Sequence, residues 1–205
     1  MSYYATDGYN GFDQTYFEGR EVGVDDRHPA GYWYYPDVNL DHAQYADEID
    51  SYVGSRKLLV VGCAYGFSIR YLRDEHGWNR VYGMDISQWA VDNAFGDVAD
   101  HIYQGDALNP DDYDDLARDT QGPPRWDGIY TEYLLSHFTD AAALQVLEIM
   151  ADEADLCVHR IWSGTGAPNG DYFNAKSVAE WQALVDDPDG PHEWIDYDSP
   201  EESTI

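Results

Sequence analysis

The sequence has few basic residues: 11 lysines and arginines stand against 40 aspartates and glutamates, which gives a formal net charge of −29. Only Lys57 and Lys176 are lysines. A protein that binds the phosphates of DNA or RNA usually carries a basic stripe or patch, and this sequence shows none. The charge balance therefore argues against a nucleic-acid substrate.

The acidic residues are spread over the whole chain and are not gathered in a tail. Disorder would explain such charge, but an aromatic content of 15% and regular apolar periodicity argue against it. The composition resembles that of proteins from salt-in halophilic archaea or their viruses. At molar salt the Debye length is about 3 Å, so the self-repulsion of such a surface is screened. The charge thus indicates a habitat more than a partner.

Long apolar runs and cysteines are also scarce. No stretch approaches the roughly 18 apolar residues of a membrane span, and "MSYYATDGYN" at the N-terminus lacks the basic and apolar regions of a secretory signal. Cys63 and Cys157 lie in apolar segments, which favours buried, reduced thiols over a disulfide framework. We therefore expect a soluble, cytoplasmic protein with no membrane partner. Its 205 residues fit one compact domain.

We divide this domain into residues 1–54, an aromatic N-terminal arm and a helix, and residues 55–205. The arm is rich in Tyr, Gly and Asp and has no clear period. A helix is predicted to start at Asp41, because apolar residues recur after it at helical spacing.

Strand and helix signals alternate through residues 55–205. Predicted strands are residues 57–62, 80–87, 101–108, 126–133, 155–162 and 192–198, and predicted helices are residues 68–77, 88–95, 139–154 and 177–187. Ser87 is positioned to cap the second of these helices, and Ser177 with Glu180 has the spacing of a capping box. The acidic segment before Pro123 and Pro124 is expected to be a connection. This alternation predicts an α/β fold: a doubly wound, mostly parallel, Rossmann-like sheet with helices on both faces.

The first strand-to-helix turn, "GCAYGF" at residues 62–67, lies where such a sheet binds ligands. A dinucleotide fingerprint needs glycines at its first, third and sixth positions. Those positions are Gly62, Ala64 and Phe67, so two of the three fail. The bulky Phe67 would obstruct the close approach of a pyrophosphate. A nicotinamide-dependent oxidoreductase is therefore disfavoured, and a ligand without a phosphate at this turn is favoured.

The run "LLVVGCAYGFSIRYL" resembles the first motif of the class I S-adenosylmethionine-dependent methyltransferases. The later motifs follow in order: "VYGMDIS", then "QGDAL", then "WDGIYTEYLLSHF". The resemblance covers residues 55–165. Each motif alone is weak, but their order and their spacing of about twenty residues are more specific. The resemblance implies the methyltransferase fold and S-adenosylmethionine as the cofactor.

The resemblance also implies a set of cofactor-binding residues. Asp85 would accept hydrogen bonds from both ribose hydroxyls, and Ile86 would lie against the adenine face. Asp106 would accept from the adenine amino group, and Ala107 would donate its backbone N–H to the ring. The backbone that would pass under the methionine part comprises Gly62, Cys63, Ala64, Tyr65 and Gly66. The competing interpretation is that Asp85 and Asp106 are surface acids of an Asp-rich chain.

The sequence departs from the family pattern at two positions. Many members carry an acid two residues before the first motif glycine, where this chain has Val60. The middle glycine of the motif is Ala64, which is a milder change. Loss of the acid removes one anchor near the cofactor's ammonium group. A non-catalytic, methyltransferase-like domain used for binding or assembly is therefore the alternative to an enzyme.

The end of the fourth predicted strand and the chain after it supply the candidate catalytic residues Glu132 and His137. Methyl transfer to oxygen or nitrogen can need a base for the acceptor's proton, and Glu132 lies near the end of that strand with His137 a few residues beyond it. His159, at the fifth strand, is a weaker candidate. A single histidine is more often structural. The sequence indicates no metal site.

The aromatic arm has two open interpretations. Tyr16, Phe17 and the cluster Tyr32–Tyr35 fold over the cofactor, whose sulfonium cation would be attracted by aromatic faces, or they cover an edge of the sheet. The short C-terminus leaves little room for the usual seventh strand of this family. We expect the exposed edge to be covered by the arm or by a second copy of the chain, as a homodimer.

The motifs also limit the acceptor. The sequence after the fourth strand has no Asp/Asn-Pro-Pro-aromatic motif, which methylation of exocyclic base amines usually carries, and neither cysteine follows a proline. The acceptors that these motifs leave open are a small molecule, a glycan and a protein side chain. Similarity to related "GCAYGF" proteins favours a small-molecule or glycan-like acceptor.

Overall fold

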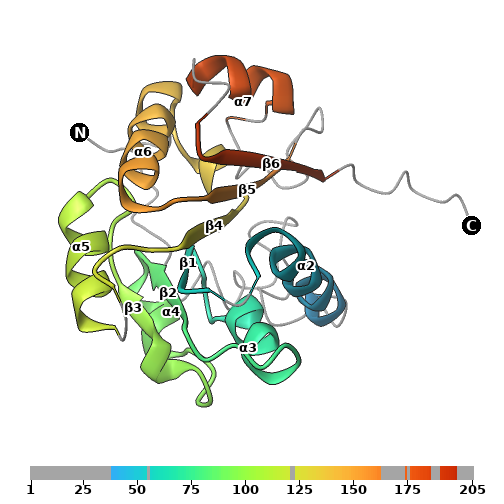
Figure 1. The fold of residues 1–205 in the computed structure, drawn as a ribbon, viewed down its shortest axis with the longest axis vertical. Coiled ribbons are helices and arrows are strands. Elements are labelled where there is room, and N and C mark those ends of the chain that lie inside the picture. The colour runs from blue at the N-terminus through green and yellow to red at the C-terminus, as the bar shows by residue number, and fades with distance from the viewer. Residues whose placement is uncertain are drawn as a thin grey trace, which may run out of the picture.

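The computed structural model describes residues 38–54, 56–120, 123–162, 174, 176–185 and 190–197 (Figure 1). The predicted aromatic arm, including Tyr16, Phe17 and Tyr32–Tyr35, lies outside the described residues. Within those ranges, no helix combines the length and the apolar character that crossing a bilayer requires.

Among the described residues, six parallel strands form one sheet in the order β3-β2-β1-β4-β5-β6 (Figure 1). Their bounds are Leu58–Val61 (β1), Val81–Asp85 (β2), Ile102–Gln104 (β3), Gly128–Glu132 (β4), Cys157–Trp162 (β5) and His192–Tyr197 (β6). All six predicted strands are present. The order runs outward from β1 through β2 to β3 and then from β4 through β5 to β6. The doubly wound, parallel fold class is therefore confirmed, and its switch point lies between β1 and β4.

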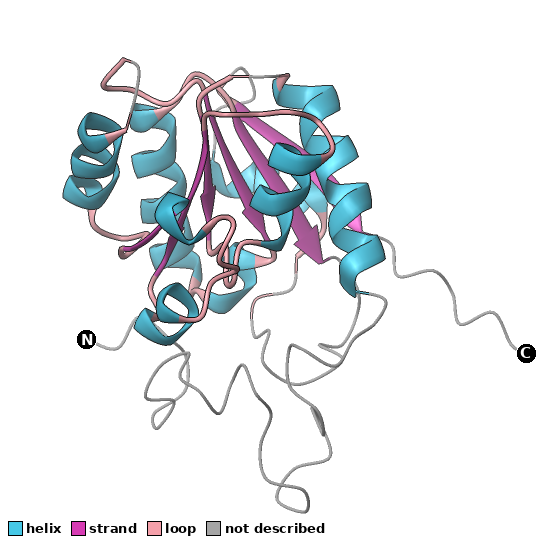
Figure 2. Ribbon diagram, turned by 90° about the horizontal axis from the view of Figure 1, so that it is seen from below, coloured by secondary structure: helices cyan, strands magenta, loops and turns pink. Residues whose placement is uncertain are grey.

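Helices cover both faces of this sheet, as Figure 1 and Figure 2 show. Helices α2 and α3 pack together on one face, and α5, α6 and α7 contribute to the core on the other. The bounds are Val38–Val53 (α2), Phe67–Asp74 (α3), Gln88–Asp92 (α4), Pro110–Asp119 (α5), Asp140–Glu153 (α6) and Val178–Val185 (α7), with short 3₁₀ helices at Ala99–His101 (η2) and Leu134–His137 (η3).

Strand β1 shows why the central strands are apolar throughout. Leu59 and Val61 point into the core beneath α5, α6 and α7, whereas Leu58 and Val60 point into the core beneath α2 and α3. All four side chains are buried. A parallel sheet covered on both faces requires this pattern, because neither side of the strand meets water. The glycine turns and acids that follow these strands are consequently held at one edge of a rigid layer.

The predicted helix caps are confirmed. The Ser87 hydroxyl accepts from the N–H of Ala90, and Ser177 and Glu180 exchange hydrogen bonds as a capping box does. Helix α2 begins three residues earlier than predicted, and α4 ends at Asp92 rather than at residue 95.

Helix α5 was missed, and the prediction of a connection there is wrong. Its acidic residues lie on the outer side, while Tyr113, Leu116 and Ala117 are buried at spacings of three and four. Pro110 occupies the first turn, where the missing N–H costs nothing. The high density of acids masked a narrow apolar stripe.

The expected absence of a seventh strand falls on residues 198–205, outside the described residues. Strand β6 pairs directly with β5 along its whole length, from Cys157 opposite His192 to Trp162 opposite Tyr197. Among the described strands, β3 and β6 are the edges. Cover of the β6 edge by the arm or by a second copy stays a prediction.

Gly66 is required by packing whether or not a ligand binds. Its φ is +85°, and a Cβ there would overlap the side chain of Ile102 and lie 3.1 Å from Cγ2 of Val98. Gly77 has a similar φ of +70° but open space around it. We expect Gly66→Ala to lower the free energy of unfolding by about 3 kcal/mol and Gly77→Ala by about 1 kcal/mol. Equal losses in urea unfolding would show that Ile102 moves aside without cost.

Candidate functional site

The candidate site lies at the carboxyl ends of β1, β2 and β3, beside the switch point. Parallel strands end at the same edge, so the turns after these strands meet there. The site is built mainly from backbone amides and carboxylates, and hydrogen bonds join one turn to the next.

The turn after β1 is fixed to the end of β2. The N–H groups of Gly62 and Cys63 both donate to the carbonyl of Met84, at 2.8 and 3.3 Å. Gly62 has a φ of +75°, and a Cβ there would lie 3.1 Å from Cδ1 of Leu134 in η3. The backbone of the turn therefore approaches the segment after β4 more closely than a side chain would allow.

Asp85 ends β2 and connects the turns. Its Oδ2 accepts from the N–H of Ala64 at 2.8 Å, and its Oδ1 accepts from the N–H of Ser87 at 2.9 Å. Its carbonyl accepts from the N–H of Gly105, which follows β3. The residue is 7% exposed. Burial raises the pKa of the Asp85 carboxyl, and the two N–H groups partly oppose that shift. Asp85 is therefore an oriented, buried carboxylate and not a surface acid.

The residues predicted to surround an adenine ring follow β2 and β3. Ile86 is half-buried, and its carbonyl accepts from the side-chain amide of Gln104 at 3.3 Å. Asp106 accepts from the N–H of Leu108 at 2.9 Å and donates its own N–H to Asp112 at 2.7 Å. Asp106 thus forms the turn that leads into α5. Its role toward a cofactor, and that of the buried Ala107, stay predictions.

Cys63 and Tyr65 of the turn are buried side chains, and each belongs to a hydrophobic cluster: Cys63 contacts the core beneath α3, and Tyr65 packs with Phe67 and Ala90. This burial agrees with the predicted role of both residues, in which the backbone and not the side chain lies next to the cofactor. Both cysteines of the chain are free and buried, as expected from the sequence.

Glu132 and His137, the candidate catalytic residues, lie at the end of β4 and in the 3₁₀ helix that follows it. Glu132 is the last residue of that strand and His137 the last of η3, and both are half-buried. Between them Tyr133 has a φ of +54°, and Ala64 in the first turn has a φ of +49°. Positive φ values are uncommon in residues other than glycine and concentrate at functional sites. The strained positions thus flank the switch point on both strands.

Sequence reasoning missed a polar cluster on the α2 face, next to Glu132. Arg160 of β5 is nearly fully buried, forms an ion pair with Glu48 of α2, and donates from Nε to the hydroxyl of Tyr133 at 3.2 Å. Tyr130 of β4 is fully buried, and its hydroxyl has no hydrogen-bond partner among the described residues. The sequence signal for this cluster was an arginine inside the apolar strand "CVHRIW", where only His159 was considered.

Two positions singled out in the sequence face the core. Val60 is 3% exposed and packs beneath α2 and α3, beside Tyr130 in the strand register. His159 has no exposed surface and lies on the opposite face of the sheet from Val60. His159 is therefore a core residue in this structure, and a catalytic role for it stays a prediction.

Neither a protein-family model nor a curated protein sequence matches this chain. Solved structures match its fold. Magnesium protoporphyrin IX methyltransferase from Synechocystis PCC 6803 with bound SAM aligns at a TM-score of 0.51 and 17% identity, over 72% of this chain and 68% of that chain. The N-terminal domain of EvdMO1, solved in the presence of SAH and D-fucose, aligns at a TM-score of 0.50 and 15% identity, over 71% of each chain. This chain has the fold of these proteins.

The likeness does not extend over the full length of every similar protein. DesVI from Streptomyces venezuelae aligns at a TM-score of 0.46 and 16% identity, over 64% of this chain. This chain spans 54% of the length of DesVI. The activity and acceptor of the whole protein are therefore matters for proposal.

Proposed function

We propose that this protein is an S-adenosylmethionine-dependent methyltransferase that moves a methyl group to a small-molecule or glycan-like acceptor. The observation that carries the proposal is the Asp85 carboxylate, oriented by the N–H groups of Ala64 and Ser87 at the carboxyl edge of the sheet. The fold likeness to a methyltransferase solved with bound SAM supports the cofactor. A similar domain solved with SAH and D-fucose supports a sugar-like acceptor.

The residues at the edge fit this cofactor. Each Asp85 oxygen accepts one N–H and keeps lone-pair capacity for a ribose hydroxyl. Gly62 has no side chain and lies close to Leu134, so the turn presents its backbone there. Val60 cannot supply the missing acid, but Tyr130 lies beside it in register, and Glu132 and Glu48 are on the same face. These groups would take the place of that acid near the ammonium group.

In the proposed reaction the protein binds the cofactor, orients the acceptor and removes the acceptor's proton. When bound, S-adenosylmethionine supplies an electrophilic methyl group. The amides of the turn from Gly62 to Gly66 and the carboxylates of Asp85 and Asp106 would hold it, with Ile86 and Ala107 beside the base. Glu132 or His137 would take the proton from the acceptor's oxygen or nitrogen. Alignment of acceptor and methyl group would supply most of the rate enhancement.

One observation favours a second candidate, a non-catalytic domain with this fold that serves in binding or assembly. The position of the family's acid is Val60, which is buried in the core and cannot turn toward a ligand. A chain that had lost its cofactor site would keep the fold and show such a change.

Calorimetric titration with S-adenosylhomocysteine tests the proposal. Because the net charge is −29, the titration is run in potassium chloride of about 1 M, where the Debye length is about 3 Å. We expect binding in the micromolar range, about −8 kcal/mol. A folded protein that does not bind would favour the non-catalytic candidate, and binding of NADH instead would favour the oxidoreductase. If the cofactor binds, turnover is then sought with radiolabelled S-adenosylmethionine and sugar acceptors.

A further inference from the structure

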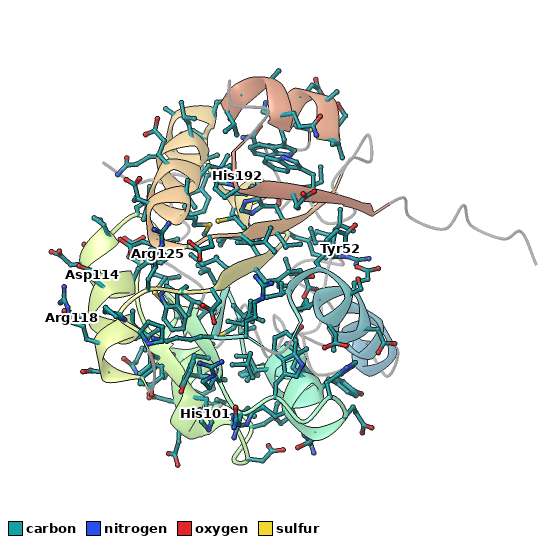
Figure 3. All side chains as sticks on the ribbon, viewed as in Figure 1. Tyr52, His101, Asp114, Arg118, Arg125 and His192 are labelled. Atoms are coloured by element: carbon teal, nitrogen blue, oxygen red, sulfur yellow. The ribbon has the colours of Figure 1, made fainter. Side chains whose placement is uncertain are left out.

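Three side chains with metal-ligating atoms meet on the α6 and α7 face of the sheet, the face opposite Tyr130. Cys157 and His159 belong to β5, and His192 belongs to β6. Their Sγ and ring nitrogen atoms all lie within 4.8 Å of one another. Cys157 and His192 are direct partners in the strand register, and His159 follows Cys157 by two residues on the same face. His192 lies at the start of β6, on the side of α7 (Figure 3).

We propose that Cys157, His159 and His192 bind a divalent transition-metal ion of the Zn²⁺ type through one thiolate and two imidazole ligands. A thiolate and neutral imidazoles are the donors that such ions prefer. The site is separate from the turns around Asp85, so it does not depend on the proposed methyltransferase activity.

The two imidazole rings need only a small adjustment to share one ion. His159 Nε2 and His192 Nδ1 are 2.9 Å apart and face each other. Two imidazole nitrogens on one tetrahedral Zn²⁺, each about 2.0–2.1 Å from the ion, are roughly 3.3 Å apart. The two rings therefore have to separate by roughly 0.4 Å, and Cys157 Sγ has to give up its contact with the carbonyl of Met150.

A neighbouring hydroxyl holds the His159 ring in the orientation that metal binding requires. Its Nδ1 lies 2.9 Å from Thr131 Oγ1, which comes from β4. When Nδ1–H donates to that hydroxyl, the lone pair of Nε2 points toward His192 and Cys157. Ligating histidines commonly use their second nitrogen in this way, which fixes the ring and its tautomer.

Burial gives the site both a favourable and an unfavourable property. Burial lowers the pKa of His159 well below its ordinary value, so this imidazole is neutral and able to ligate. Burial also raises the pKa of Cys157 to about 12, so the thiol has to lose its proton to the solvent when the metal binds. His192 is half-buried and is the most accessible of the three proposed ligands.

Cobalt(II) titration of the full-length, chelator-treated protein tests the site. Co²⁺ adopts the geometry of Zn²⁺ but absorbs light, and a thiolate ligand adds a charge-transfer band in the near ultraviolet. We expect one equivalent of Co²⁺ to give this band together with the strong visible bands of a tetrahedral site. Zn²⁺ should displace the cobalt and abolish the spectrum. Cys63→Ser changes the other buried cysteine and should leave the cobalt spectrum intact.

The variants Cys157→Ser and His192→Asn separate this site from other binding. Cys157→Ser should lose the charge-transfer band, and His192→Asn should weaken cobalt binding at least tenfold. His192 lies at the edge of the sheet, so His192→Asn keeps the test valid if Cys157→Ser does not fold. An unchanged spectrum in either folded variant would overturn the proposal. So would a folded wild-type protein that binds cobalt only with the weak absorption of an octahedral carboxylate site, as surface acids would give.

Discussion

Asp85→Asn is expected to weaken binding of S-adenosylhomocysteine at least tenfold, which corresponds to about 1.4 kcal/mol. The carboxylate accepts one N–H on each oxygen and would accept one ribose hydroxyl on each as well. An amide has only one oxygen, and its NH₂ group would face a backbone N–H in place of an acceptor. The neutral amide is also a weaker acceptor than an anion. Calorimetric titration of wild type and variant measures the difference.

The same substitution has a structural cost that has to be measured separately. Either Ala64 or Ser87 loses the acceptor of its N–H in a buried place, which costs about 1–3 kcal/mol of stability. Urea unfolding of the free protein reports this loss. Asp119→Asn is the matched control, since Asp119 is exposed on α5 and its substitution should change neither stability nor affinity appreciably. An affinity of Asp85→Asn within twofold of wild type would contradict the assignment of Asp85 to the ribose.

The pH dependence of S-adenosylhomocysteine affinity shows whether the Asp85 carboxylate binds the cofactor or only holds the turns together. Burial raises the pKa of Asp85 above its ordinary value of 3.8. A group whose pKa is raised by folding contributes stability below its unfolded pKa and loses that contribution as pH rises. Acidification therefore does not destabilise the fold through Asp85, whereas it removes the anionic acceptor for the cofactor. We expect the affinity of wild type to fall on acidification more steeply than that of Asp85→Asn.

The parts of the fold that were predictable from sequence are those determined by local patterns. Buried strands, the Ser87 cap and the capping box at Ser177 each follow from a few neighbouring residues. The alternation of strands and helices then fixed the parallel topology, and with it the common edge that holds Gly62, Asp85 and Asp106. Helix α5 was missed because acids outnumber its three buried apolar residues, so composition outweighed periodicity.

Contacts between distant segments were not predictable from sequence. Cys157 and His192 meet only because β6 pairs with β5 in one particular register. Glu48 and Arg160 are 112 residues apart, and they meet because α2 packs on the face of the sheet that carries Tyr130 and Val158. Neither a period nor a motif encodes such a pair. The sequence therefore identified the turns of the candidate site but not the side chains that support them.

Glu48→Ala is expected to lower the free energy of unfolding by about 2–3 kcal/mol. The side chain of Arg160 is 2% exposed and that of Glu48 is 26% exposed, so water screens the pair poorly. Without Glu48, a buried guanidinium loses a carboxylate that neutralises it. The cost stays below that of a completely isolated buried charge, because Arg160 still donates to the Tyr133 hydroxyl. Urea unfolding at constant salt measures the change.

The pair Asp114 and Arg118 on α5 is the matched control. It is an ion pair of 2.7 Å with side chains 44% and 58% exposed, and Figure 3 shows both residues on the outer side of the helix. Asp114→Ala should cost about 0.5 kcal/mol or less, because exposed pairs are screened and entropically costly to hold. If both substitutions cost the same, burial does not strengthen the Glu48–Arg160 pair and α2 is held by its apolar contacts alone.

A double-mutant cycle with Arg160→Met isolates the interaction itself. The double variant replaces both charges by apolar side chains and should be more stable than Glu48→Ala alone, because it also removes the buried guanidinium that has lost the Glu48 carboxylate. We expect a coupling energy of about 2 kcal/mol for this pair, against a few tenths for Asp114 with Arg118. Arg160 also contacts the hydroxyl of Tyr133, whose φ is +54°. The single variant Arg160→Met should therefore weaken S-adenosylhomocysteine binding as well as stability, because the strained turn after β4 loses a side-chain contact.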